Sequence, residues 1–399
     1  MPSDPIVIVS AARTPMGGLQ GELKTFTAAE LGAAAIRAAL ERAKLAPEAV
    51  QEAIIGCVLA AGQGQAPARQ AALGAGLPLA VGCTTVNKMC GSGMKAAMLA
   101  HDLLIAESAQ VIVAGGMESM SNAPYLLPRA RAGYRMGHQQ VIDHMFFDGL
   151  EDAYAKDEKG GGRLMGSFAE DCAVKYGFTR AAQDAFAIAS LQRAQQANRE
   201  GWFAWETTPL AIKAGKEEKF VETDEQPFKA NLDKIPTLKP AFRKDGSVTA
   251  ANSSSISDGA AALVMMRRST ADRLGLAPLA RVVGHASHAQ EPGWFTTAPV
   301  GAIRKLLERC GWQAKDVDLY EINEAFAVVT MAAMQEHGLP HDKVNVHGGA
   351  CALGHPIGAS GARILVTLIG ALRKYGLQRG VASLCIGGGE ATAMALERV

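Results

Sequence analysis

Ser92-Gly-Met-Lys95 recurs near the end of this 399-residue chain as Ser360-Gly-Ala-Arg363, and each copy opens an apolar stretch with helical spacing. A strand pattern follows each helix. The first of these strands ends in Ala114-Gly-Gly116 and the second in Ile386-Gly-Gly388. Self-similarity on this scale predicts a duplicated sheet domain and argues against a solenoid of short repeats.

Strands and helices alternate in both halves, which is the pattern of an α/β fold. Thr27 is the predicted N-cap of the first helix, with Glu30 as its capping-box partner. The expected strands are 5–10, 53–59, 109–116, 280–285, 317–322, 344–347 and 381–386, and the expected helices are 27–43, 93–107, 179–199, 300–310, 325–337 and one that opens at 360.

One long segment interrupts the repeat. Residues 119–242 carry proline, arginine, Gly160-Gly-Gly162 and a charge run from Lys213 to Glu225. We expect this inserted loop domain to cover a substrate or to make subunit contacts, with most of its charges facing solvent. The N-terminal half is then formed by residues 1–118 and 243–272, and the C-terminal half by residues 273–399.

Composition narrows the class of protein. Hydrophobic residues make up 48% and charged residues 20%, as in a globular chain. Because 40 basic residues balance 39 acidic ones, no global basic field favours a nucleic-acid partner. The N-terminus lacks the basic and apolar regions of an export signal, and the apolar runs are too short to span a membrane. Seven scattered cysteines fit a reducing compartment, so we expect a cytoplasmic protein.

Three glycine-rich segments hold the residues with the most reactive side chains. They read Val86-Asn-Lys-Met-Cys90-Gly-Ser-Gly93, Gly354-His355-Pro-Ile-Gly358 and Ser383-Leu-Cys385-Ile-Gly-Gly-Gly389. Glycine lets a substrate carbonyl approach the backbone, so that amide donors can converge on an oxyanion. Cysteine supplies a nucleophile and histidine a base. Together the segments indicate an acyl-transfer enzyme.

Cys90 precedes a predicted helix, where aligned amides favour the thiolate over the thiol. The alternative for Cys90 and Cys385 is a buried thiol that packs as a small hydrophobe. Gly91-x-Gly93-x-x-Ala96 also fits a dinucleotide fingerprint, but residues 84–88 make a poor strand to precede one. That interpretation is therefore weak.

His355 is flanked by glycine and proline, which favours a base over a histidine packed in the core. His347, Cys351 and His355 stand four residues apart, but the glycines between them oppose the continuous helix that a metal site at this spacing would need. Asn323-Glu-Ala-Phe326 lies at a strand-to-helix junction, where a sheet delivers polar groups to a cleft. Helix capping by Asn323 is the alternative.

Over essentially its whole length the sequence resembles the thiolases, in particular the bacterial acetyl-CoA acetyltransferases. Several motifs carry the resemblance together. They are Asn87-Lys-Met-Cys-Gly-Ser-Gly-Met-Lys-Ala96, Gly115-Gly-Met-Glu-Ser-Met120, Asn252 with Ser254, Asp258-Gly-Ala-Ala261, Asn323-Glu-Ala-Phe-Ala327, Gly354-His-Pro-Ile-Gly-Ala-Ser-Gly-Ala-Arg363 and Cys385-Ile-Gly-Gly-Gly389.

The resemblance implies a five-layered αβαβα fold and a ping-pong reaction through an acyl-Cys90 intermediate. It implies thiolysis of 3-ketoacyl-CoA in one direction and Claisen condensation of two acetyl-CoA in the other. Cys385 would exchange the α-proton, which requires a thiol pKa near working pH. His355 would activate Cys90 and polarise a thioester oxygen, with Asn323 acting through a water, and the amides of Cys90 and Gly387 would form a second oxyanion hole.

The resemblance also implies the surroundings of the reaction. Coenzyme A would be substrate and product, with no metal and no separate cofactor. Residues 124–137 are similar to a loop that ties dimers into tetramers, so a homo-oligomer is expected. The predicted wall of the pantetheine tunnel is Met165, Phe242, Ala250, Ser254, Ala325 and Phe326.

Three positions depart from the family pattern. Leu164 stands where many short-chain members have histidine, which leaves the acyl-chain length open and makes a broad 3-ketoacyl-CoA thiolase of fatty-acid degradation the main alternative. His347 replaces an asparagine, next to the unusual Cys351. Glu390 places a charge near Cys385, where it would raise the thiol pKa or point away. A 3-ketoacyl synthase would need a second histidine in place of Cys385, and a non-catalytic acyl-CoA-binding homologue would be expected to lose the nucleophile or the base.

Overall fold

Two duplicated half-sheets join edge to edge. The structure is a computed structural model that describes residues 4–158, 160–215 and 217–399. Over these residues ten strands form one sheet in the order β14-β15-β16-β13-β1-β12-β5-β3-β4, with the short β2 paired to β12. The strands are β1 (Ile6–Arg13), β2 (Gly17–Gly18), β3 (Glu52–Gly56), β4 (Gly82–Val86), β5 (Val111–Ser119), β12 (Ser257–Arg267), β13 (Ala280–Ala289), β14 (Leu319–Ile322), β15 (Arg379–Ile386) and β16 (Glu390–Arg398).

Strand order and direction repeat between the halves. In the first, β3 runs parallel to β5, and β12 then runs antiparallel to β5 and to β1. In the second, β14 runs parallel to β15, and β16 runs antiparallel to β15 and to β13. The halves meet at β1 and β13, where only Val7 with Arg281 and Ile8 with Ala280 are paired. The predicted duplication is therefore confirmed.

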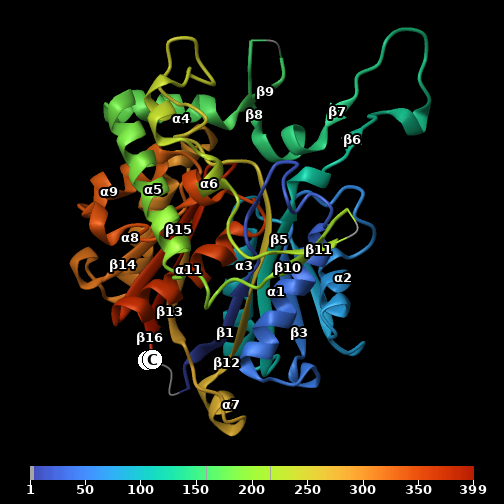
Figure 1. Cartoon of the computed structure of the whole chain (residues 1–399), viewed down its shortest axis with the longest axis vertical. Coiled ribbons are helices and arrows are strands. Elements are labelled where there is room, and N and C mark those ends of the chain that lie inside the picture. Colours follow the sequence, from blue (N-terminus) through green and yellow to red (C-terminus); the bar gives the residue numbers. More distant parts are fainter. Residues whose placement is uncertain (1–3, 159, 216) are drawn as a thin grey trace.

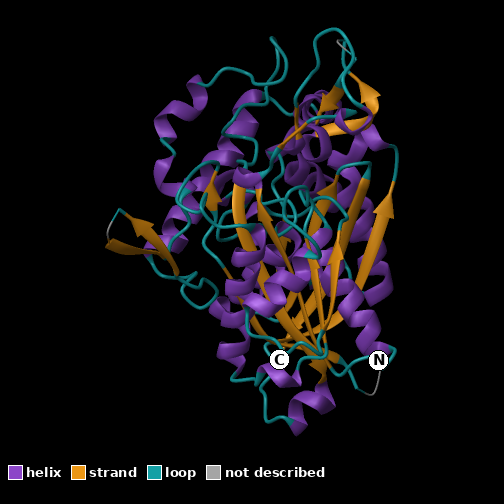
Figure 2. Cartoon of the chain, turned by 90° about the vertical axis from the view of Figure 1, so that its right-hand side faces the viewer, coloured by secondary structure: helices purple, strands orange, loops and turns teal. Residues whose placement is uncertain are grey.

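Helices cover both faces of each half-sheet and produce five layers (Figures 1 and 2). One apolar cluster joins the outer helices α1 (Ala28–Ala43) and α2 (Pro67–Gly74) to the first half-sheet. A second cluster places α3 (Ser92–Ile105) and α11 (Ser360–Tyr375) between the half-sheets. A third packs α8 (Ala298–Cys310) and α9 (Ala327–His337) on the far side. This is the predicted αβαβα order.

The repeated Ser-Gly pair explains why the two central helices lie so close. A Cβ on Gly93 would stand 2.8 Å from the backbone nitrogen of Ala362, and a Cβ on Gly361 would stand 2.4 Å from that of Met94. Real Cβ atoms do not approach so closely, so glycine is required at both positions. The first turns of α3 and α11, which follow Cys90 and His355, are thereby packed against each other.

Most of the inserted segment, teal to yellow in Figure 1, lies at the upper end of the molecule, and its hairpin at residues 210–214 and 217–221 lies lower, against the first half. Thr179 caps the predicted helix α5, and Thr27 forms the predicted capping box with Glu30 at the start of α1. The charge run contributes to an exposed hairpin. The remaining elements are β6 (Tyr125–Leu126), β7 (Ile142–Asp143), β8 (Glu151–Lys156), β9 (Gly162–Leu164), α4 (Met165–Tyr176), α5 (Arg180–Arg199), β10 (Leu210–Ala214), β11 (Glu217–Val221), α6 (Gln226–Lys229), α7 (Arg268–Arg273) and α10 (Ala350–Leu353).

Two local predictions were wrong. Residues 344–347 do not form a strand, because the side chain of Asn345 takes the place of strand backbone: its Oδ1 accepts from the Ile322 amide and its Nδ2 donates to the Ile322 carbonyl, both at 2.8 Å. Conversely, Gly82–Val86 does form a strand, β4, which runs parallel to β3. The threonines of β4 suit a partly exposed edge.

Candidate active site

All three glycine-rich segments border one cavity of about 390 Å³. Cys90, His355, Cys385 and Gly387 line it, so residues from three distant parts of the chain meet there. Asn323 lies behind the wall. The six side chains predicted for the tunnel also line the cavity: Met165, Phe242, Ala250, Ser254, Ala325 and Phe326.

Cys90 sits on a tight turn between β4 and α3. Met89 before it has a φ of 47°, a left-handed conformation that non-glycine residues rarely adopt. Burial raises the pKa of the Cys90 thiol to about 11, although the backbone amides of Gly387 and of Cys90 itself lower it. The expected thiolate is therefore not favoured in the ligand-free site, because desolvation outweighs the amides. A base must remove the proton during the reaction.

The hydrogen bonds of His355 leave one ring nitrogen available to accept a proton. Its Nδ1 lies 2.5 Å from the Ser360 hydroxyl, which in turn donates to the Pro356 carbonyl at 3.0 Å. Since the hydroxyl proton is used in this way, we assign the imidazole proton to Nδ1. Buried Nε2 then keeps its lone pair and has no hydrogen-bond partner among the described residues. Burial, followed by the charge of Arg363, lowers the pKa of His355 to about 3, so the ring is neutral.

Cys385 ends β15 and is fully buried beside Cys90. Burial, and then the charge of Cys90, raise the pKa of the Cys385 thiol well above its ordinary value. A thiol pKa near neutrality is therefore not found in the ligand-free site. That second cause requires an ionised Cys90, so it is absent while Cys90 is a thiol or is acylated.

Asn323 belongs to a buried series of polar contacts that starts at the His355 imidazole. Its Nδ2 lies 3.5 Å from His355 Nδ1, and its Oδ1 accepts from Arg363 at 3.4 Å. Arg363 in turn faces the buried Glu321 at 3.5 Å. The capping alternative for Asn323 is wrong, because the N-cap of α9 is Phe326. A water-mediated role for Asn323 stays a prediction.

Glu118, on β5, supports the site and was not singled out from the sequence. It is fully buried and accepts from the amides of Val58, Leu59 and Gly358 at 3.0, 3.1 and 2.9 Å. Burial raises the pKa of Glu118 to about 7, although these three hydrogen bonds lower it. Gly358 belongs to the His355 segment, so Glu118 ties that segment to the first half. The signal in the sequence that could have identified Glu118 is a carboxylate near the end of an otherwise apolar strand.

The departures from the family pattern have different surroundings. Leu164 lines the cavity. His347 is buried among the rings of Trp202, Phe203 and Tyr375, away from His355, and Cys351 bonds to the Glu324 carbonyl, so the three do not form a common metal site. Glu390 turns to Lys88 and forms an ion pair with it. The raised pKa of Cys385 is caused by burial first and then by the charges of Cys90 and Cys172.

Comparisons with known proteins agree on one family. Residues 6–269 match the family described as "Thiolase, N-terminal domain" and residues 276–398 match "Thiolase, C-terminal domain". An Arabidopsis thaliana protein, "Acetyl-CoA acetyltransferase 2", is 50% identical over 98% of this chain and 96% of its own length. The "Acetyl-CoA acetyltransferase" of Cupriavidus necator is 49% identical over 98% of this chain and 99% of its own. The crystal structure of Acat5 thiolase from Ascaris suum in complex with coenzyme A has a TM-score of 0.92 and 39% identity, and covers 99% of this chain and 100% of that one.

Proposed function

The chain belongs to the thiolase family, and we propose that it interconverts two molecules of acetyl-CoA with acetoacetyl-CoA and free coenzyme A. It is an acyltransferase, as the sequence predicted. One observation supports the assignment above the others: two thiols and an imidazole whose Nε2 has no partner among the described residues share one largely apolar cavity. The roles of the individual residues below are part of the proposal.

The first half-reaction acetylates Cys90. His355 Nε2 takes the thiol proton as the sulfur attacks the carbonyl of acetyl-CoA, and the bond between that carbonyl and the coenzyme A sulfur breaks. Coenzyme A leaves with a proton from Cys385. The amides of Cys90 and Gly387 would hold the tetrahedral oxyanion. The site then contains acetyl-Cys90, an imidazolium and a Cys385 thiolate, so protons and charge balance.

The second half-reaction forms the carbon–carbon bond. The Cys385 thiolate removes an α-proton from a second acetyl-CoA, and the His355 imidazolium stabilises the enolate oxygen, with Asn323 acting through a water. The carbanion attacks acetyl-Cys90, and Cys90 leaves and regains its proton from His355. Acetylated Cys90 cannot ionise, so no neighbouring thiolate charge opposes the Cys385 thiolate at the stage where it is needed.

A broad-chain 3-ketoacyl-CoA thiolase is the second candidate, and Leu164 favours it. Leu164 lies on the cavity wall, together with the apolar side chains of Phe146, Leu150 and Ile357. An apolar wall binds added methylene groups at about 0.8 kcal/mol for each one buried. The reaction chemistry is the same in both candidates, and only the acyl chain differs.

CoA-dependent thiolysis of acetoacetyl-CoA, 3-ketohexanoyl-CoA and 3-ketooctanoyl-CoA, followed as thioester loss at matched concentrations, separates the two candidates. Activity confined to acetoacetyl-CoA is expected for an acetyl-CoA acetyltransferase. Equal or higher kcat/KM on the longer substrates would replace that assignment with the broad thiolase of fatty-acid degradation. Turnover of none of them would refute both.

We also propose a homo-oligomer, either dimer or tetramer, in a reducing cytoplasmic compartment. The loop around β6 and β7 projects from the molecule (Figure 1), and it exposes Leu127 and Val141. Every one of the seven cysteines lies within the described residues and is free. The described helices include none long and apolar enough to cross a membrane. Light scattering on the purified protein, with and without residues 126–139, tests whether this loop joins subunits.

A further inference from the structure

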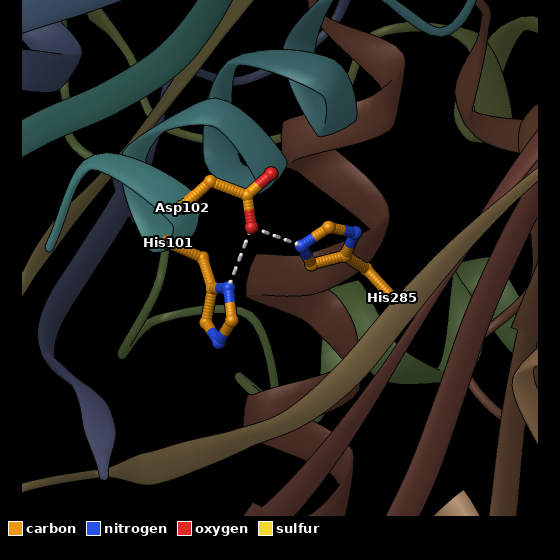
Figure 3. Close-up of side chains that lie close together, drawn as sticks. All are labelled: His101, Asp102 and His285. Atoms are coloured by element: carbon orange, nitrogen blue, oxygen red, sulfur yellow. Dashed lines mark hydrogen bonds and ion pairs between the residues drawn. The ribbon is translucent and has the colours of Figure 1, made fainter. Parts of the chain in front are cut away.

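Outside the cavity, three side chains converge on one point between the halves of the molecule. His101 and Asp102 extend from α3, and His285 extends from β13 (Figure 3). One carboxylate oxygen, Asp102 Oδ1, lies 3.1 Å from His101 Nδ1 and 2.8 Å from His285 Nε2. The two imidazole rings stand edge to face with their centroids 5.0 Å apart. The proposed thiolase reaction uses none of these groups.

The three groups form a donor set for a transition metal. Two imidazole nitrogens and one carboxylate oxygen suit Zn²⁺, Ni²⁺ or Co²⁺ and do not suit Mg²⁺ or Ca²⁺, which prefer oxygen ligands. One atom from each residue lies within 4.8 Å of the others. Ligands bound about 2.1 Å from one ion stand about 3.0 Å apart in octahedral and about 3.4 Å apart in tetrahedral geometry, so the two separations that involve Asp102 are near these values. The third separation, between the ring nitrogens of His101 and His285, is at most 4.8 Å and must be near the same values for both rings to bind one ion.

The carboxylate of this cluster is open to solvent, and the two imidazoles are largely covered. The side chain of Asp102 is 55% exposed, whereas those of His101 and His285 are 17% and 12% exposed. The imidazoles are therefore restrained by packing, while the carboxylate side opens to solvent. Arg309, whose guanidinium donates to the His285 carbonyl at 2.5 Å, is a nearby cation that opposes binding. The carboxylate charge offsets it.

We propose that His101, Asp102 and His285 bind one divalent transition-metal ion of the Zn²⁺, Ni²⁺ and Co²⁺ class, with water in the remaining positions. Such an ion would tie α3 to β13 and hence the central helix to the C-terminal half. Because an ion that binds only the folded chain stabilises it, the thermal midpoint would rise with metal concentration. The ion has a structural role here and takes no part in acyl transfer.

Titration of the purified full-length protein with Co²⁺ and Zn²⁺, by calorimetry and by Co²⁺ absorption, tests the proposal. The background carries Cys90→Ala and Cys385→Ala, so that the reactive thiols do not compete for metal. We expect one bound ion, without thiolate-to-metal charge-transfer bands. His285→Ala and Asp102→Asn should each weaken binding at least tenfold, since loss of even an outer-shell partner has an effect of that size.

His288→Ala is the matched control, because His288 lies on the same strand and bonds only locally, to Gln290 at 3.0 Å. It should bind the ion as the background protein does, and the rise in thermal midpoint should persist in it and disappear in His285→Ala. If His285→Ala does not fold, Asp102→Asn still tests the site, because it keeps the shape of the side chain. Equal metal affinity in the background, His285→Ala and Asp102→Asn proteins would overturn the site, and binding without a rise in thermal midpoint would overturn the tie between α3 and β13.

Discussion

Replacing Ser360 with alanine removes the hydroxyl that fixes the tautomer of His355. The hydroxyl lies 2.5 Å from Nδ1 and is completely buried, so water cannot take its place. An unpaired buried hydrogen-bonding group costs about 1 to 3 kcal/mol. If that cost appears in the transition state, kcat/KM falls about 5- to 150-fold, because each 1.36 kcal/mol is a factor of ten.

The tautomer gives this prediction a direction as well as a size. Without the Ser360 hydroxyl, Nδ1 still has the Asn323 amide nitrogen at 3.5 Å, which is a donor. A donor at that position favours the tautomer with the proton on Nε2, which cannot accept the Cys90 proton. We therefore expect Ser360→Ala to lower kcat, with little change in KM.

Single-turnover thiolysis and a thermal melt, measured together, provide the assay. Ser383→Ala is the control, because the Ser383 hydroxyl is equally buried and also donates to a backbone carbonyl, that of Thr392 at 2.9 Å. Both variants should lose similar stability, and only Ser360→Ala should lose rate. A Ser360→Ala enzyme with kcat within about twofold of the wild type and a lowered thermal midpoint would refute the tautomer argument.

Three further substitutions have defined outcomes. Leu164→His puts a polar ring on the apolar wall, so kcat/KM for 3-ketooctanoyl-CoA should fall about tenfold relative to acetoacetyl-CoA, and an unchanged ratio would remove Leu164 from the specificity argument. Burial first, and then the charge of Lys374, lower the pKa of His347 to about 4. As the pH falls from 6.5 toward 4, the unfolded chain binds this proton before the folded one does, so the folded protein loses stability over that range. Between pH 7 and pH 4 the free energy of unfolding should therefore fall by about 3 kcal/mol less in His347→Asn than in the wild type, whereas parallel pH curves for the two proteins would contradict this. Glu390→Gln breaks a partly exposed ion pair with Lys88, so stability should change by about 1 kcal/mol or less and the pH–rate profile should stay in place; a shift of about one pH unit would show that Glu390 does act on Cys385.

The fold could be predicted because its signals are local and repeated. The Ser-Gly pairs at 92–93 and 360–361 open both central helices, and the strands that follow end in paired glycines. The predictions that were wrong concern stretches whose structure depends on partners distant in the sequence. Residues 344–347 have a strand-like composition, but the Asn345 side chain, not a strand ladder, pairs with Ile322. β4 is polar and became a strand because β3 offers it an open edge.

The site residues could be located from glycine-rich motifs, but their protonation could not. The charge state of Cys90 depends on how completely the assembled cavity excludes water, which no local pattern encodes. A helix N-terminus favours the thiolate, and burial nevertheless raises the thiol pKa to about 11. Glu118 was missed for a related reason: its three amide partners come from segments far from it in sequence.

Acetylation of Cys90 tests the central claim most directly. The wild type, Cys90→Ala and Cys385→Ala proteins are mixed with acetyl-CoA, quenched in acid, digested and examined by mass spectrometry. The account predicts one acetyl group on the peptide that contains Cys90 in the wild type and, formed more slowly because the acid that protonates coenzyme A is missing, in Cys385→Ala. It predicts none in Cys90→Ala, and acetoacetyl-CoA from the wild type alone. An acetyl group on Cys385, or turnover by Cys90→Ala, would contradict it.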